Sequence, residues 1–235
     1  MAEPLKLLQI TDTHLFPSRE TTLLGINTCD SLRAVLRQAF REDAPDIVLA
    51  TGDIAQIAEA ATYGLFLELL GEHFDGPLMC VPGNHDLGDV FTAELPTAGI
   101  DAGGWQIVPV DTHVDDNVEG RFAESDRTTL GKTLENADKP VLVVGHHSPV
   151  DVGATWLDGQ RIPEQDGLLE TLTASDAVKC YLFGHVHQIY ENVVSGMRLM
   201  ATPSTCFQFE PGSKRFSIDS AKPGYRWLEL HSDGS

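Results

Sequence analysis

Two histidines stand two positions apart in the stretch LFGHVHQIY, residues 182–190. The stretch is rich in apolar and β-prone residues, so we expect a strand, in which residues two apart point to the same face. His185 and His187 would then share a partner, and a metal ion is the commonest shared partner of imidazoles. A hydrogen-bonded pair in a sheet is the alternative, so the interpretation depends on whether the chain supplies further ligands.

Further groups that can bind metals follow four other apolar runs. In chain order they are Asp12, His14, Asp53, Asn84, His85, His146 and His147. With the first pair they offer mixed nitrogen and oxygen ligands, which suit Mn, Fe, Zn or Co better than Ca or a thiolate-binding ion. Four groups per ion with one shared carboxylate require seven ligands, so the number indicates two ions. Two ions about 3.5–4 Å apart are the usual device for in-line displacement at phosphorus.

Each of these groups also has a structural explanation. Asp12 and Asp53 could cap turns at strand ends, and Asn84 could be a turn residue after Pro82-Gly83. Adjacent strand residues face opposite ways, so only one of His146 and His147 is expected to reach an ion, and spacing does not say which. Asp86 could brace the preceding loop, but a cap on the helix that follows is the favoured interpretation.

Apolar periodicity predicts the elements that must position these groups. Helices are expected over 30–40, with Asp30 or Ser31 as N-cap, and over 62–74, 122–137 and 168–175. Strands are expected over 5–14, 45–53, 76–86, 105–114, 139–149, 178–188, 197–209 and 224–231. The first two-thirds alternate between strand and helix and the last third is strand-rich, which predicts one layered α/β domain, residues 1–235, with two sheets. In such sheets, functional groups gather where the strands end.

Composition limits the class of function. The 235 residues carry a formal charge of −19, which argues against general affinity for nucleic acid or for anionic membranes. A compact anionic substrate could still bind beside metal ions. No run approaches the roughly 20 apolar residues of a membrane span. The N-terminal residues lack a signal-peptide pattern, and the four cysteines are far apart without CxxC spacing, so we expect a reduced cytoplasmic protein.

Five motifs occur in the order D-x-H, G-D, G-N-H-D, H and G-H-x-H between residues 12 and 187. This order resembles the calcineurin-like metallophosphoesterase superfamily. The resemblance implies a four-layer α/β fold in which two mixed β-sheets pack as a sandwich flanked by α-helices. The segments LQITDTHLF, LLGINT, TWLDGQ, LMATPSTCFQF and PGYRWLELHSDG further resemble class III cyclic nucleotide phosphodiesterases, among them bacterial enzymes that act on 3′,5′-cyclic AMP.

The resemblance assigns roles to the matching residues. It implies a first ion held by Asp12, His14 and His187, a second held by Asn84, His146 and His185, and Asp53 bridging both. It selects His146 over His147, for which a role behind the ligands or at the surface is favoured. His85 would bind no ion, but would face the scissile phosphate, stabilise its charge and protonate the leaving oxygen. The residues implied to contact substrate are His14, Asp53, Asn84, His85, His146 and His187.

The implied reaction hydrolyses 3′,5′-cyclic AMP to 5′-AMP, by attack of a metal-bridging hydroxide opposite the 3′ oxygen. Two divalent ions are implied, with Fe or Mn favoured and Zn or Co as alternatives. The small cyclic nucleotide is the expected partner of a monomer or homodimer. Trp156 and Phe207 could line an adenine pocket, although core packing explains Phe207 equally well. The segment from Thr202 to Thr205 resembles a family loop near the active site, whereas His73, His113 and His231 have no place in the pattern.

Three competing functions remain on the residues alone. One keeps the metal site but widens the substrate to 2′,3′-cyclic nucleotides, glycerophosphodiesters or nucleotide-sugar esters. A second is a non-catalytic binding protein with a retained metal site, which loss of His85 or Asp53 would have indicated, and both are present. A third, a nuclease, is disfavoured because the acidic chain lacks a basic track.

Overall fold

A four-stranded sheet carries the first part of the site. The computed structural model describes residues 3–235, so residues 1–2 of the predicted domain lie outside the described residues. The strand order is β12 (Arg226–Leu230), β1 (Leu5–Ile10), β4 (Ile47–Thr51) and β5 (Leu78–Val81). β12 runs antiparallel to β1, and the other neighbours are parallel. The near-continuous apolar run of β4 is fully buried, as expected where both faces of a sheet are covered.

A six-stranded sheet carries the remaining site residues. Its order is β10 (Tyr190–Val194), β11 (Met197–Ala201), β9 (Val178–Phe183), β8 (Val141–Val144), β7 (Trp105–Pro109) and β6 (Ile100–Ala102). The inner neighbours are parallel, and β10 and β6 pair antiparallel at the two edges. A separate two-stranded ribbon joins β2 (Thr22–Leu23) to β3 (Ile26–Asn27).

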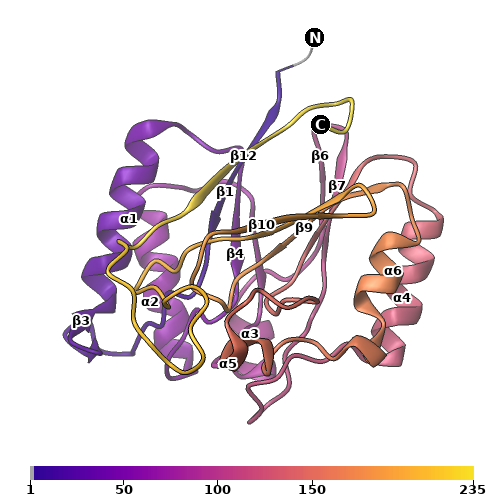
Figure 1. Cartoon of the computed structure of the whole chain (residues 1–235). Coiled ribbons are helices and arrows are strands. Elements are labelled where there is room, and N and C mark those ends of the chain that lie inside the picture. The colour runs from indigo at the N-terminus through magenta and orange to yellow at the C-terminus, as the bar shows by residue number, and fades with distance from the viewer. Residues whose placement is uncertain (1–2) are drawn as a thin grey trace.

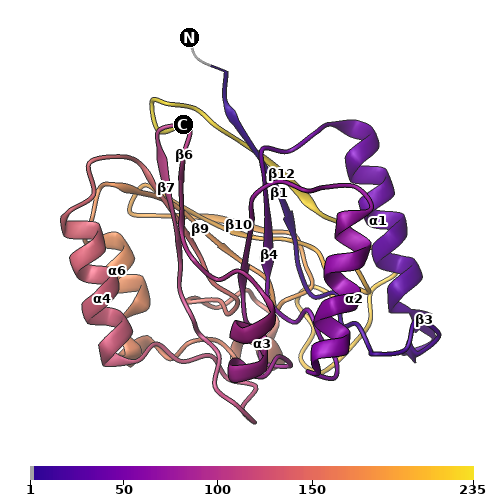
Figure 2. The same ribbon diagram turned by 180° about the vertical axis from the view of Figure 1, so that it is seen from behind.

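Helices cover the outer face of each sheet. The first sheet packs against α1 (Thr28–Glu42), α2 (Ala60–Gly71) and α3 (Gly88–Glu94). The second packs against α4 (Glu124–Glu135), α5 (Thr155–Asp158) and α6 (Leu168–Thr173), with a 3₁₀ turn over Glu164–Asp166. Figures 1 and 2 show α1 and α2 on one flank and α4 and α6 on the opposite flank, with the strands between them. The predicted four-layer fold with two mixed sheets is therefore confirmed.

Apolar side chains between the two sheets hold them face to face. Leu49 and Met79 of the first sheet share this core with Trp105, Leu142 and Leu182 of the second. All five are buried, so the relative position of the sheets is set by close packing. The loops at the C-terminal ends of β1, β4, β5, β8 and β9 consequently meet at one end of the molecule.

Several sequence-based boundaries are wrong. Helix α1 begins at Thr28, and its N-cap is Asn27, whose side-chain oxygen accepts a hydrogen bond of 2.9 Å from the amide of Asp30. Neither Asp30 nor Ser31 is the cap, because asparagine precedes them with the same capping chemistry. The strand expected over 178–188 ends at Phe183, and the one expected over 197–209 ends at Ala201.

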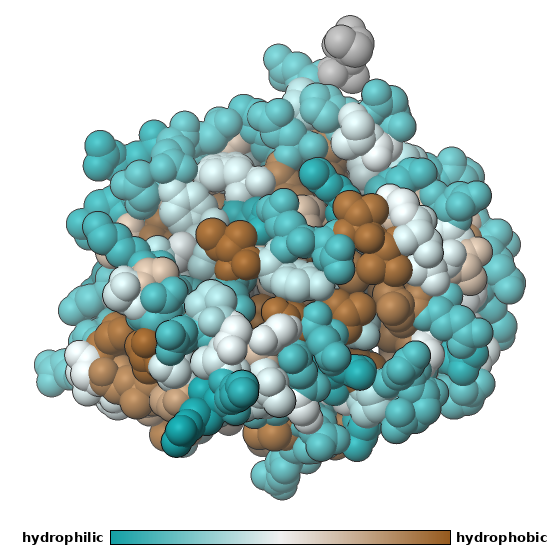
Figure 3. Space-filling model, viewed as in Figure 1, coloured by the Kyte–Doolittle hydropathy of each residue, from teal (hydrophilic) through white to brown (hydrophobic). Residues whose placement is uncertain are grey.

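The surface agrees with the acidic, polar composition. In Figure 3, hydrophilic residues cover most of the visible face and small hydrophobic clusters interrupt them. Within residues 3–235, no helix has both the length and the apolar character needed to cross a membrane.

Candidate metal centre and substrate cleft

The loops after five strands bring the predicted site residues together. Asp12 and His14 follow β1, Asp53 follows β4, Asn84 and His85 follow β5, His146 follows β8, and His185 and His187 follow β9. Backbone hydrogen bonds tie these loops to one another: the amide of Asp12 donates to Gly52 over 3.0 Å, and that of Gly184 donates to His146 over 3.1 Å. Loops from both sheets therefore contribute to one site.

One half of the site joins loops of β1 and β9. His187 Nε2 lies 3.3 Å from Asp12 Oδ1 and 3.1 Å from His14 Nε2. The other His187 nitrogen, Nδ1, donates to the carbonyl of Phe207 over 2.7 Å. A carbonyl only accepts, so in neutral His187 the lone pair is on Nε2 and points at the carboxylate and at His14.

The other half joins loops of β5, β8 and β9. Asn84 Oδ1 lies 2.9 Å from His185 Nδ1 and 3.3 Å from His146 Nε2. His146 Nδ1 faces the carbonyl of Thr51 at 2.8 Å, so its Nε2 is left for the centre of the site. His185 and His187 thus belong to different halves, and the expectation from strand alternation that they share one partner is wrong.

Asp53 lies between the two halves. Its Oδ2 is 3.8 Å from His14 Nε2, and its Oδ1 is 3.5 Å from His146 Nε2. The backbone amide of His85 donates to Oδ1 over 2.8 Å, which fixes the carboxylate. Asp53 is therefore positioned to contact ligands from both halves.

The donor set fits metal ions. Carboxylate oxygens, an amide oxygen and imidazole lone pairs face one another within 3.8 Å, although acceptors repel when nothing lies between them. Four overlapping triads of histidine and aspartate satisfy the spacing of a metal site. They are Asp12–His14–His187, Asp12–Asp53–His146, His14–Asp53–His85 and His146–His147–His185. Two divalent cations would convert these opposed acceptors into ligands.

A left-handed backbone conformation, and not the alternation of a β-strand, directs these side chains into the site. Asp12, His14, Asp53, His185 and His187 all have φ between 46° and 65°. Each such non-glycine residue costs roughly 1–2 kcal/mol, a strain that clusters at functional sites. The absence of a side chain at Gly52 lets His146 approach closely, because a Cβ there would lie 2.2 Å from His146 Nδ1.

The buried titratable groups of the site shift one another's pKa values. Burial lowers the pKa of His14 to about 4 and that of His185 to about 3. Burial also opposes charge on His146, but the carboxylate of Asp53 outweighs it and raises the pKa of His146 to about 9. Burial likewise acts against ionised Asp53, yet His146 and its neighbours hold the Asp53 pKa well below its usual range. The centre of the site therefore attracts positive charge even when only protons supply it.

Asp86 braces two site loops, which corrects the prediction that it caps a helix. Its carboxylate accepts hydrogen bonds from four donors, the amides of Ile54, Ala55 and Gly83 and the hydroxyl of Tyr63, at 2.9–3.3 Å. The residue that precedes α3 is Leu87, and its side chain makes no cap. Two of the donors, Ile54 and Ala55, come from a loop 31 to 32 residues away, a contact that local sequence patterns do not reveal.

His147 is buried, so the surface alternative for it is wrong. Its Nδ1 lies 2.8 Å from Thr112 Oγ1, and its ring centroid is 4.7 Å from that of His185. His146, by contrast, faces Asp53 and Asn84. The two adjacent histidines therefore point in different directions. His146 points toward the centre of the site, and His147 lies behind His185.

A cleft of about 360 Å³ opens over this cluster. One side is an aromatic wall made of Trp156, Phe207, Phe209 and Phe216. Phe209 stacks on His187 with ring centroids 4.3 Å apart, and Trp156 meets Phe209 edge-on at 4.8 Å. Leu24, Val118 and Phe216, each more than half exposed, stand at the mouth of the cleft. Both Trp156 and Phe207 thus line the cleft, and Phe207 is also part of the core.

The predicted family loop supports the floor of the cleft. The hydroxyl of Ser204 donates to the carbonyl of Asp12 over 2.7 Å, and the amide of Thr205 donates to that of Thr11 over 3.1 Å. The segment therefore lies beside the loop that carries Asp12 and His14.

Comparison with known proteins agrees with this architecture. The family model described as calcineurin-like phosphoesterase matches residues 5–189, which is most of the chain. The chain belongs to the calcineurin-like phosphoesterase family. It is 38% identical over 241 residues to "3′,5′-cyclic adenosine monophosphate phosphodiesterase CpdA" of Escherichia coli strain K12, covering 98% of this chain and 87% of that protein. The protein of the same name from Pseudomonas aeruginosa is 35% identical, over 97% and 86% of the two chains.

Solved structures share the fold at low sequence identity. A dimetal phosphatase from Danio rerio has a TM-score of 0.66 at 14% identity, with 97% of this chain and 99% of that chain covered. A purple acid phosphatase from yellow lupin seeds has a TM-score of 0.62 at 14% identity, with 98% and 48% covered. At this identity the likeness supports the phosphoesterase fold alone.

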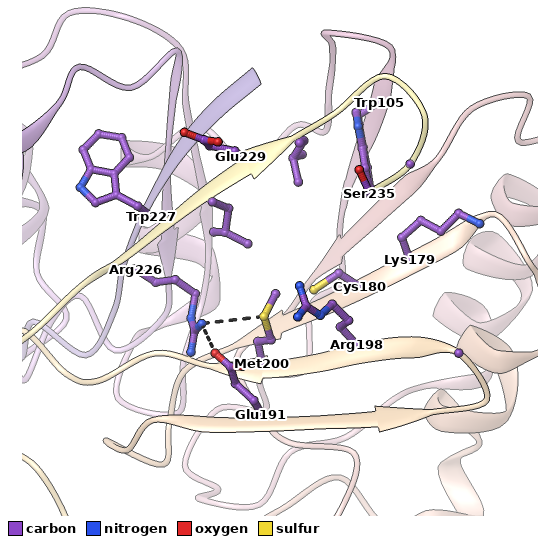
Figure 4. A pocket seen from close by; sticks show the side chains of 14 residues that line it. Trp105, Lys179, Cys180, Glu191, Arg198, Met200, Arg226, Trp227, Glu229 and Ser235 are labelled. Atoms are coloured by element: carbon purple, nitrogen blue, oxygen red, sulfur yellow. Dashed lines mark hydrogen bonds and ion pairs between the residues drawn. The ribbon is translucent and has the colours of Figure 1, made fainter. Parts of the chain in front are cut away.

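A second hollow, of about 490 Å³, lies between β12 and the hairpin of β10 and β11 (Figure 4). Arg226 reaches into it, pairs with Glu191 at 2.6 Å and also donates to Thr202. The described residues that line it include none of the predicted ligands. The candidate site is therefore the smaller cleft over the histidine cluster, which contains predicted ligands.

Replacing Asp86 with alanine should destabilise the protein by about 3 kcal/mol or more. The change leaves buried backbone donors without an acceptor, and each costs roughly 1–3 kcal/mol. Urea unfolding followed by tryptophan fluorescence measures the change. Asp89→Ala, at an exposed position in α3, is the control and should stay within about 0.5 kcal/mol of the wild type. Equal stability of the two variants would contradict the bracing role.

The stability of the metal-free protein should peak near pH 6.5. Below that pH, unfolding lets His14 and His185 take up protons that burial denies them in the fold, so stability falls. As pH rises through about 9, His146 loses the proton that the fold retains, so its stabilisation is lost. Each group should contribute on the order of 1 kcal/mol per pH unit.

Urea unfolding of chelator-treated protein between pH 5 and pH 10 measures this profile. His146→Gln should remove much of the alkaline decline and leave the acid side in place. A flat profile, or an alkaline decline that is unchanged in His146→Gln, would contradict the assignment.

Proposed function

We propose that the chain is a metal-dependent phosphodiesterase that hydrolyses 3′,5′-cyclic AMP to 5′-AMP. The observation that carries the proposal is the buried cluster of opposed carboxylate, amide and imidazole acceptors at the bottom of a cleft with an aromatic wall. The similarity to the two named CpdA proteins supports the choice of substrate. Membership of the calcineurin-like phosphoesterase family supports the class of reaction.

Seven residues would hold two divalent ions. Asp12, His14 and His187 form one ligand set, Asn84, His146 and His185 form the other, and Asp53 would be shared. Bound ions of this kind neutralise phosphate oxygens and supply a nucleophile at neutral pH. The nitrogen-rich set suits Fe or Mn, with Zn and Co as alternatives.

The cleft residues would orient the phosphate. The cleft is lined by imidazoles, one carboxylate, amides and apolar groups, so compensation of the phosphate charge must come from cations or imidazoles. His14, Asp53, Asn84, His146 and His187 surround the position between the two ligand sets. His85 stands beside them at the exposed side of the cleft, where it would assist the leaving 3′ oxygen.

The aromatic wall would receive the base. Phe209 and Trp156 are held in place by their edge-on contact and by the hydrogen bond of 3.0 Å from Trp156 Nε1 to Ser213 Oγ. Phe216 is 54% exposed and adds an accessible ring at the mouth. Stacking of a base on an aromatic side chain contributes about 1–3 kcal/mol, which a glycerol moiety would not gain.

A broader phosphodiesterase is the second candidate. The metal ligands alone would serve 2′,3′-cyclic nucleotides, glycerophosphodiesters or nucleotide-sugar esters equally well, since they touch only phosphate. The wall favours substrates with a base, so 2′,3′-cyclic nucleotides are the closest rivals. We also propose a cytoplasmic monomer or homodimer, which suits four free, buried cysteines.

Removing metal should abolish hydrolysis of cyclic AMP, and adding Mn²⁺ should restore it. The reason is that without ions nothing would neutralise the phosphate oxygens beside the buried carboxylates or supply the nucleophile. Product 5′-AMP is measured by chromatography, and metal is measured by elemental analysis, with about two ions per chain expected. Rates with 2′,3′-cyclic AMP, glycerophosphocholine and bis-p-nitrophenyl phosphate rank the alternatives.

Two results would contradict the proposal. One is full activity in protein that contains no detectable metal. The other is turnover of 3′,5′-cyclic AMP no faster than in buffer, and faster turnover of a rival substrate would then identify the broader enzyme.

His85→Ala should retain the ions and lower kcat by about 10²–10⁴-fold, the range for a group lost from the leaving oxygen, whether it transfers a proton or only hydrogen-bonds. The change removes a side chain that is no predicted ligand, so metal content separates catalysis from loss of the site. His231→Ala, at an exposed position near the C-terminus, is the control and should keep wild-type kinetics. Unchanged kcat in His85→Ala would remove His85 from the mechanism.

A further inference from the structure

The side chain of Gln56 connects two histidines with different roles. Its amide oxygen Oε1 lies 3.0 Å from His14 Nδ1. Its amide nitrogen Nε2 lies 3.1 Å from His85 Nδ1. The rings of His14 and His85 meet edge-on with centroids 5.0 Å apart. One amide group therefore joins a predicted metal ligand to the predicted leaving-group residue.

Backbone pairing fixes Gln56 at this point. The amide of His14 donates to Asp53, that of Leu15 to Ile54, and that of Gln56 to Leu15, at 2.7–3.0 Å. Leu15 and Ala55 also form a parallel bridge. The loops after β1 and β4 thus continue side by side beyond their strands, and Gln56 is held next to His14.

The amide of Gln56 has one accepting end and one donating end, so it fixes which partner donates in each of the two hydrogen bonds. If His14 offers the Nε2 lone pair to an ion, its proton is on Nδ1, which must donate to an acceptor. Gln56 Oε1 is that acceptor, so the NH₂ end of the amide faces His85. An NH₂ group only donates, so His85 Nδ1 must accept. The proton of neutral His85 is then on Nε2.

We propose that Gln56 is a positioning residue that holds His85 as the Nε2–H tautomer, by transmitting to His85 the proton position that metal binding requires of His14. The inference rests on the proposed function, because it assumes that His14 binds an ion. His85 Nε2–H then stands as a hydrogen-bond donor on the cleft side of the ring, with Nδ1 occupied by Gln56.

This order also defines how His85 assists the reaction. In this tautomer His85 Nε2–H hydrogen-bonds the phosphate or the leaving 3′ oxygen, and the proton that completes the 3′ hydroxyl comes from water in the cleft. That role differs from the delivery of a whole proton that the family resemblance implies.

Nitrogen NMR of protein labelled with ¹⁵N-histidine and loaded with diamagnetic Zn²⁺ tests the tautomer directly. Couplings of the ring nitrogens to the two carbon-bound protons identify which nitrogen is protonated, and His85→Ala assigns the signal. The expected result is a protonated Nε2 and an unprotonated Nδ1 in wild-type His85. A protonated Nδ1 would overturn the proposal.

Gln56→Glu separates positioning from packing. The carboxylate still accepts from His14, so metal content should be retained, but it also accepts from His85 and should move the His85 proton to Nδ1. We expect kcat for cyclic AMP to fall by roughly 10–100-fold with little change in KM, as is typical for partners behind the ligands. Gln160→Glu puts the same charge into the same cleft without a side-chain hydrogen bond to either histidine, and should leave the His85 tautomer unchanged.

Failure of this inference is distinguishable from failure of the proposed function. Wild-type protein that binds Zn²⁺ but does not hydrolyse cyclic AMP would refute the function and leave the tautomer measurement valid. Active wild-type protein whose Gln56→Glu variant keeps both the Nε2–H tautomer and full kcat would refute the role of Gln56 alone.

Discussion

The crowding of hydrogen-bond acceptors at the centre of the site is the constraint on which the rest of the structure depends. Asp12 and Asp53 are almost fully buried, and the nitrogens of His14, His146 and His187 face them. Buried carboxylates are unfavourable unless cations and hydrogen-bond donors compensate them. Backbone amides satisfy part of this need, because the amide of His185 donates to both oxygens of Asp12. The remaining need can be met only by positive charge between the two halves.

The sandwich of two sheets provides the rigid frame that such a site requires. Left-handed residues on both sides of the site are strained, and they persist because the surrounding structure determines them several times over. The paired loops after β1 and β4, the brace at Asp86 and the core between the sheets all act on the same few residues. Relaxation of any one loop is opposed by contacts to two others, so the acceptors stay close together without collapsing into ordinary hydrogen bonds.

Much of the fold and of the residue set could be predicted from the sequence, whereas the contacts that organise them could not. Apolar runs with polar ends indicated both sheets and the loops that meet, because burial and periodicity are local properties. The N-cap at Asn27, the brace at Asp86 and the bridge at Gln56 escaped prediction for different reasons. Asn27 competed with nearby residues of equal capping ability, while Asp86 and Gln56 act across 29 to 42 residues of chain. The left-handed turns at His185 and His187 were concealed by a β-prone composition, since tertiary contacts overrode local preference.

The same structure separates the chemistry of the site from its choice of substrate. The predicted metal-binding cluster would contact only the phosphate that all phosphodiesters share, and a solved structure at 14% identity shares the fold. The residues of the aromatic wall belong to the loop after β11 and to α5, two elements that contribute no predicted ligand. Phe209 nevertheless stacks on His187, so the surface that would hold a base is in van der Waals contact with the group that would hold an ion. Substitutions in that loop can therefore alter substrate preference through stacking. A large movement of the loop, however, would also displace His187.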